Sequence, residues 1–218
     1  MFLHTHPYSP FIPKNATKLI VGTLPPPRFT EKVFKEGDVD FSYGSRDGYL
    51  WPILNRIFSL NLVFETTEEA IQQRKLFLAA YQIGICDIVA SAEREQIDAS
   101  DLGMKNIECR DLIFYLNENP TIDTILFMGG NSKNGPEYLF RKQLKDKGIK
   151  LETISSDVPR KYQFKIGNRN IKTVSLTAPS GAANRAVGAI PEYKALKKKH
   201  PNLNTIDFRV LQYIKYFV

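Results

Sequence analysis

Short apolar runs alternate with amphipathic stretches along most of this chain. Four of the runs are apolar enough to be buried strands, and they span residues 18–22, 83–89, 122–128 and 171–176. Helical spacing and helix-start signals predict six helices, at 51–58, 66–81, 107–117, 136–147, 191–200 and 205–217. Strands that alternate with helices predict an α/β protein whose mostly parallel sheet carries helices on both faces.

The remaining segments add detail to this fold class. Residues 150–166 have the spacing of a hairpin, which predicts an extra element there. Residues 1–17 are rich in proline and aromatic side chains and predict an ordered extended arm, whereas 90–104 is polar and predicts a loop. Since no internal repeat or low-complexity linker interrupts the pattern, we expect a single domain over residues 1–218.

Composition limits the partners and the setting. The chain is 43% hydrophobic, which is enough for a core, and its net charge of +7 favours an anionic partner, most commonly nucleic acid. A merely basic protein with scattered lysines is the alternative. The two cysteines, Cys86 and Cys109, lack metal-ligand spacing, so no metal cluster is expected. We find neither a signal-peptide pattern nor a membrane-spanning run, and we therefore expect a cytoplasmic protein with no membrane partner.

The candidate chemistry lies in the loops that follow the predicted strands. In a parallel sheet these loops gather along one edge, where α/β proteins bind ligands, and here they span 22–28, 86–95, 129–135 and 177–185. The first of them lacks the Gly-Lys-Ser/Thr end of a P-loop and forms a stiff strand end. Backbone amides of the last one could hold a phosphate, or it could be a plain loop.

Two acidic residues are candidates within these segments. Asp87 ends the second predicted strand, where a carboxylate is expensive to bury unless it is hydrogen-bonded or functional. It could line the ligand edge, or it could cap the loop at Ser91. In residues 41–49 an aromatic ring could stack on a base while Asp47 faces the sugar. The alternatives are an ordinary Asp-Gly turn and aromatic rings that belong to the core.

Four segments, in this order, resemble motifs of the uracil-DNA glycosylase superfamily, most closely its hypoxanthine-DNA glycosylase-like and mismatch-specific branches. They are a strand ending in Gly-x-x-Pro at 18–26, an aromatic segment at 43–51, a Cys-Asp-Ile-Val stretch within 85–94 and a Pro-Ser turn ending in Ala-Asn at 178–184. The resemblance implies a three-layer α/β/α sandwich around a central parallel four-stranded sheet.

It also implies a DNA glycosylase that flips a deaminated base, uracil or hypoxanthine, out of the stack and hydrolyses its N-glycosidic bond, as in base excision repair. Such an enzyme needs no cofactor, and we expect a monomer whose partner is DNA. The site residues that it implies are Asp47 as the catalytic group, Phe41, Tyr43, Asp87, Gly22 and Thr23 at the base, and Ser180, Gly181, Asn184, Arg185 and Arg46 at the DNA.

The motifs depart from the family pattern at three points. Leu24 stands in the region where many relatives carry an Asp or Asn that positions water. Asp47 stands at the position of the catalytic Asn of the hypoxanthine branch, with one residue inserted before Trp51 and without the His-Pro pair. The Pro-Ser turn lacks the His that some relatives aim at the departing base. A carboxylate can still orient water and stabilise positive charge on the sugar, so Asp47 is the expected catalytic residue.

Two other hypotheses remain open. One is a glycosylase-fold protein that binds DNA or a nucleotide without cleaving it, and the reach of Asp47 toward the sugar of a base stacked on Tyr43 would separate it from the enzyme. The other is an unrelated doubly wound enzyme that acts on a small phosphorylated metabolite. A pocket too narrow for a flipped nucleotide would favour that one.

Overall fold

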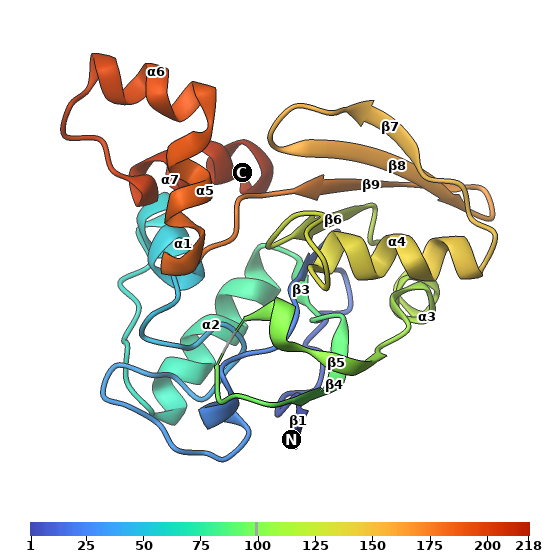
Figure 1. Cartoon of the computed structure of the whole chain (residues 1–218), viewed down its shortest axis with the longest axis horizontal. Coiled ribbons are helices and arrows are strands. Elements are labelled where there is room, and N and C mark those ends of the chain that lie inside the picture. The colour runs from blue at the N-terminus through green and yellow to red at the C-terminus, as the bar shows by residue number, and fades with distance from the viewer. Residues whose placement is uncertain (99) are drawn as a thin grey trace.

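Helices cover both faces of a six-stranded mixed sheet in the computed structural model, which describes residues 1–98 and 100–218 (Figure 1). The strand order is β3 (Ile83–Ile85), β2 (Lys18–Val21), β6 (Thr124–Phe127), β9 (Arg169–Ser175), β8 (Arg160–Ile166) and β7 (Glu152–Ser155). From β3 to β9 the pairing is parallel, whereas β8 and β7 pair antiparallel.

The sheet is therefore larger than the expected four parallel strands, because two antiparallel strands extend it to a mixed sheet of six. The predicted hairpin forms, and it lies within the sheet as β7 and β8 rather than beside it. The cause is the tight turn after β8, where Gly167 adopts a φ of 55° and returns the chain at once into β9. So short a connection obliges β8 to pair antiparallel with β9.

The helices begin where local signals favour them. Their bounds are α1 Leu50–Phe58, α2 Glu68–Ala80, α3 Leu112–Glu118, α4 Pro136–Asp146, α5 Asn184–Ala189, α6 Pro191–Lys199 and α7 Thr205–Phe217. Thr67 caps α2 by accepting from the Ala70 amide, and Pro136 occupies the first turn of α4. In residues 1–98 and 100–218 no helix combines the length and the apolar character that crossing a bilayer requires.

Alternating side chains of the parallel strands build two cores. Leu19 and Val21 of β2 face one cluster of buried residues, to which α3 and α4 contribute. Ile20 faces the other cluster, with α1, α2 and α7. Since every second residue of a strand points to the same face, this alternation separates the two helical layers.

A second, three-stranded sheet was not expected from the sequence. It has the order β1 (Phe2–Thr5), β4 (Val89–Arg94) and β5 (Lys105–Cys109), all antiparallel. The predicted strand 83–89 ends at Ile85, and β4 occupies part of the predicted loop 90–104. The predicted helix 107–117 starts late, because Asp111 accepts hydrogen bonds from the Ile113 and Phe114 amides and so caps α3.

Candidate functional site

The carboxyl ends of β3, β2, β6 and β9 lie along one edge of the sheet, as their parallel register requires. The turn after β3 is fixed to the neighbouring strand end: the Cys86 amide donates to Ile20 O at 2.9 Å, and the Ile88 amide donates to Gly22 O at 2.9 Å. Asp87 lies between these two anchors and so points its side chain across the end of β2.

The Asp87 carboxylate is buried, at 5% exposure, and both of its oxygens have donors. Its Oδ1 accepts from the Gly22 amide at 2.7 Å and from the Tyr43 hydroxyl at 2.9 Å. Its Oδ2 lies 3.0 Å from His6 Nε2. Because His6 Nδ1 accepts from the Tyr8 amide, the imidazole proton is on Nε2, which donates to Asp87. The carboxylate thus joins the N-terminal arm, the end of β2 and the aromatic segment.

Tyr43 covers the end of β2. A Cβ added to Gly22 would lie 2.1 Å from the Tyr43 hydroxyl oxygen, so only glycine allows this approach. The backbone of Tyr43 has a φ of 59°, which is uncommon for a residue with a side chain. Burial and the adjacent charge of Asp87 raise the pKa of Tyr43 well above its usual range, so the hydroxyl remains a neutral donor.

Phe41 belongs to the core. Its side chain is 6% exposed, and its ring centroid lies 6.1 Å from that of Trp51 and 6.2 Å from that of Phe11. Trp51 is in turn fixed by a hydrogen bond from its Nε1 to Ser42 O. Of the two rings expected near the base, Tyr43 therefore lies at the sheet edge while Phe41 packs beneath it.

Asp47 occupies an open position in the same segment. Its side chain is 71% exposed and its Oδ2 lies 3.6 Å from Arg28 Nη2. Arg28 is held mainly by Asp38, to which it donates from Nε and Nη2 at 2.9 Å each. Arg46, the expected DNA contact beside Asp47, is exposed and donates from Nη1 to Glu36 O.

Asp38 organises this loop, and we did not single it out from the sequence. Its side chain is fully buried, and besides Arg28 it accepts from the Arg46 and Lys35 amides. Burial alone would raise the pKa of Asp38, but the hydrogen bonds from Arg28 and from the two amides outweigh it and lower the pKa below its usual value. No local sequence pattern marks Asp38, because its donors are brought together only when the loop folds.

The Pro-Ser loop meets the aromatic segment directly. Gly48 and Ser180 form a β-bridge, and the Tyr49 amide donates to Pro179 O at 2.8 Å. Arg209 of α7, fully buried, fastens the loop from behind by donating to Ala178 O, to Ser180 O and to the side-chain oxygen of Asn184. Asn184 is thereby used within the protein, whereas Gly181 and Arg185 are exposed on the outer side.

A second carboxylate lies near Asp87 and was treated from the sequence only as part of a polar loop. Asp101 Oδ1 accepts from the Thr23 hydroxyl at 2.7 Å. Burial raises the pKa of Asp101; the hydrogen bond from Thr23 and the charge of Arg94 oppose this rise, and the charge of Asp87 adds to it. A half-buried carboxyl group with a raised pKa at a ligand edge is a candidate proton carrier.

Thr23 and Asp101 thus meet at the edge where Gly22, Tyr43 and Asp87 also meet. Two described cavities, of about 270 and 460 Å³, lie elsewhere, and none of these five residues lines either of them. Nor does Asp47. The candidate site is therefore an edge of the sheet, formed by loops and side chains, and not one of the two described cavities. It holds one exposed carboxylate, Asp47, and two more enclosed ones, Asp87 and Asp101.

Comparisons with known proteins support the fold. No protein-family model and no curated protein matches the chain. Among solved structures, it is similar to the solution NMR structure of a putative uracil DNA glycosylase from Methanosarcina acetivorans, with a TM-score of 0.57 and 15% sequence identity. The similarity covers 99% of this chain and 97% of that one, so the two share their fold over nearly their whole length.

Proposed function

We propose that this chain is a DNA glycosylase that removes uracil or hypoxanthine from DNA by base flipping and hydrolysis of the N-glycosidic bond. The observation that carries the proposal is the meeting of three motif loops at one sheet edge, through the Tyr43–Asp87 hydrogen bond and the Gly48–Ser180 bridge. The full-length similarity in fold to a putative uracil DNA glycosylase supports it.

In this proposal Asp47 is the catalytic residue. Its exposed carboxylate can orient a water molecule toward C1′ of the flipped nucleotide and stabilise positive charge on the sugar as the bond to the base breaks. The water oxygen then bonds to C1′ and its proton passes to Asp47, while the departing base takes up a proton from solvent. Arg28, at 3.6 Å from Asp47, forms an ion pair with this carboxylate and limits its motion, so Asp101 is the alternative proton acceptor.

The other residues bind rather than react. The rim formed by Gly22, Thr23 and Tyr43 receives the base, and Asp87 acts mainly by fixing the Tyr43 hydroxyl and the Gly22 amide. The exposed side of the Pro-Ser loop, with Ser180, Gly181 and Arg185, meets the DNA strand together with Arg46. Asn184 and Arg209 hold that loop in shape from within. We further propose that the enzyme acts as a cytoplasmic monomer without a cofactor.

A protein of the same fold that binds DNA without cleaving it is the second candidate. The observation that favours it is the use of both Asp87 carboxylate oxygens by donors of the protein itself, together with the ion pair between Asp47 and Arg28. Such an edge could hold a base without activating water.

One assay separates these candidates. Labelled oligonucleotides with a single uracil or hypoxanthine, single-stranded or mismatched, are incubated with the protein and then treated with alkali to cut abasic sites. We expect strand cleavage with the wild-type protein and its loss with Asp47→Asn. Binding without base release would favour the binding protein, and absence of both would reject the two DNA-based functions.

A further inference from the structure

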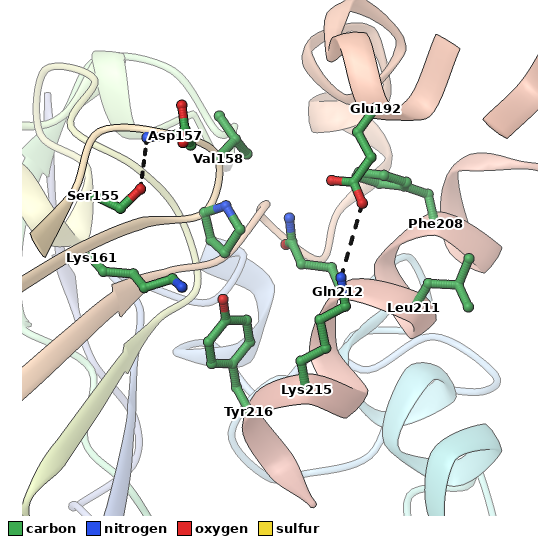
Figure 2. Close-up of a pocket in the computed structure, with 11 residues that line it drawn as sticks. Ser155, Asp157, Val158, Lys161, Glu192, Phe208, Leu211, Gln212, Lys215 and Tyr216 are labelled. Atoms are coloured by element: carbon green, nitrogen blue, oxygen red, sulfur yellow. Dashed lines mark hydrogen bonds and ion pairs between the residues drawn. The ribbon is translucent and has the colours of Figure 1, made fainter. Parts of the chain in front are cut away.

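A cavity of about 270 Å³ opens between the turn that joins β7 to β8 and the C-terminal helices α6 and α7 (Figure 2). It lies at the same sheet edge as the Pro-Ser loop, because β8 begins at Arg160, which pairs with Ser175 at the end of β9. Its size is slightly below the range of roughly 300–1,000 Å³ that is typical of small-molecule sites. None of the residues assigned to the candidate site above lines it.

Gln212 presents a buried donor to this cavity. Its amide oxygen accepts from the Thr177 amide at 2.9 Å and from the Thr177 hydroxyl at 3.0 Å. Since a backbone N–H can only donate, the oxygen must face Thr177 and the NH₂ group must face the other way. That nitrogen, on a side chain that lines the cavity and belongs to a residue only 5% exposed, has no hydrogen-bond partner within the described part of the chain. Buried donors are rarely left unpaired, so its direction points to an acceptor from outside the chain.

The charged residues of the lining divide into two groups. Figure 2 shows Lys161, Lys215 and Tyr216 on one side of the cavity and Asp157 and Glu192 on the other. Lys161 Nζ lies 5.9 Å from the Tyr216 ring centroid. Among the described residues, an ion pair between the two groups joins Lys215 to Glu192 at 3.9 Å, and these side chains are 63% and 54% exposed. An ion pair of that kind contributes little and can exchange for a ligand.

Apolar side chains make up much of the rest of the lining. They are Val158, Pro159, Leu211 and Phe208, the last of which is 1% exposed. A ligand that satisfies the whole lining therefore has an anionic group, hydrogen-bond donors and a flat or apolar body.

We propose that the cavity binds a nucleoside 5′-monophosphate whose base carries an exocyclic amine. The phosphate, with a charge of about −1.5 to −2 at neutral pH, matches the two ammonium groups and accepts from the Gln212 NH₂ and the Tyr216 hydroxyl. The amine donates to Glu192 or Asp157, and the base lies against the apolar wall. This site is separate from the proposed glycosylase function and does not depend on it.

Calorimetric titration of the intact protein with AMP, IMP and adenosine tests both ends of the ligand. IMP carries an oxygen acceptor in place of the amine and would turn it toward the two carboxylates, while adenosine lacks the phosphate. We expect AMP to bind at least about tenfold more tightly than either.

Matched variants assign the contacts. Lys161→Gln and Gln212→Glu should each weaken AMP binding at least about tenfold. The first variant removes an ammonium group that faces the phosphate. The second keeps an acceptor for Thr177 but turns a carboxylate oxygen toward the phosphate. Lys165→Gln, on an exposed position of the same strand, should change nothing. Asp157→Asn combined with Glu192→Gln should reduce the preference for AMP over IMP.

Three results would overturn the proposal. They are no AMP binding up to millimolar concentration, equal affinities for AMP and IMP, or equal affinities for AMP and adenosine. Circular dichroism of each variant identifies any that fails to fold. Should Gln212→Glu fail, Lys215→Gln replaces it, since that side chain is 63% exposed and its removal leaves the core intact.

Discussion

Asp87 and Asp47 are two carboxylates at one sheet edge with opposite surroundings. Asp87 is 5% exposed and receives three hydrogen bonds from three segments of the chain. Asp47 has a 71% exposed side chain and one distant cation, Arg28, at 3.6 Å. The sequence makes them candidates for different reasons: Asp87 ends a predicted strand, whereas Asp47 stands in the aromatic segment, at the position of the catalytic Asn of the hypoxanthine branch that the segment resembles.

The difference separates two uses of a carboxylate. A buried carboxylate whose oxygens are all satisfied stabilises the fold, and removing a donor from it exposes an unpaired charge to a poorly solvated environment. An exposed carboxylate adds little stability but is free to meet a substrate. Substitutions in the Asp87 network should therefore lower the free energy of unfolding, whereas a substitution at Asp47 should lower the rate of base release.

The largest effect is expected at Gly22. In Gly22→Ala the new Cβ would lie 2.1 Å from the Tyr43 hydroxyl oxygen and 3.0 Å from Asp87 Oδ1, so Tyr43 must move and its hydrogen bond is lost. We expect a loss of about 3 kcal/mol in the free energy of unfolding, measured by urea denaturation. Gly188→Ala is the control, because an added Cβ there meets nothing within 4 Å outside its own helix and chain neighbours. Equal stability of the two variants would contradict the close packing of Tyr43 on β2.

At Asp47 the expected effect is on the rate. Asp47→Asn should slow base release at least about 100-fold, the lower range for loss of a general base, while changing the free energy of unfolding by less than about 0.5 kcal/mol. Single-turnover cleavage of a uracil or hypoxanthine oligonucleotide measures the first quantity. Glu36→Gln, in the same exposed loop, serves as the control. If Asp47→Asn retains full activity and Asp101→Asn does not, the catalytic carboxylate is Asp101.

Much of the main sheet could be predicted from the sequence. Its buried strands are continuous apolar runs, such as Leu19-Ile20-Val21, and the helices carry local start signals at Thr67 and Pro136. The small sheet could not, because β4 and β5 are short, half-exposed and rich in charge. β4 pairs with Phe2–Thr5, which is distant in the chain, in a register that places Phe2 opposite Arg94, and β5 pairs with β4. Strand propensity does not report such long-range pairing.

In the candidate site, too, local patterns predict some features and long-range contacts determine the others. Strand-end reasoning brought Gly22 and Asp87 to one edge, since parallel strands end together. The same reasoning could not reveal the three donors around Asp87, because one of them, His6, lies 81 residues away in the chain. Asp38 and Asp101 were missed for a related reason: their donors Arg28 and Thr23 are placed by loops whose shape no local pattern specifies.

A smaller effect is expected at the Tyr43 hydroxyl. Tyr43→Phe keeps the ring over Gly22 but removes one of the three donors to Asp87, which should lower the free energy of unfolding by about 1.5 kcal/mol. Base release should change little if the ring, rather than the hydroxyl, contacts the base. Tyr81→Phe is the control, because Tyr81 is 43% exposed and its hydroxyl forms no hydrogen bond with the described residues. If Tyr43→Phe loses base release while its free energy of unfolding is unchanged, the Tyr43 hydroxyl acts in the reaction and not only in packing.

The last effect concerns pH and the arm that brings His6 to Asp87. His4, in β1, accepts at Nδ1 from Arg94 Nε at 2.8 Å. Burial, the charge of Arg94 and the nearby His6 lower the pKa of His4 from 6.5 to about 4. The unfolded chain therefore binds this proton at a higher pH than the folded chain, so the stability contributed by neutral His4 is complete above 6.5 and is lost as the pH falls toward about 4.

Replacing His4 should remove this pH dependence. Urea denaturation of His4→Gln, which keeps an acceptor for Arg94, should lose the slope that the wild-type protein shows between pH 6.5 and about 4, whereas His200→Gln, on an exposed residue, should keep it. An unchanged slope in His4→Gln would assign the acid sensitivity to another group. Since β1 leads directly to His6, acid that loosens β1 should release His6 from Asp87 first, and the Asp47 loop, held by Arg28 and Asp38, should stay in place.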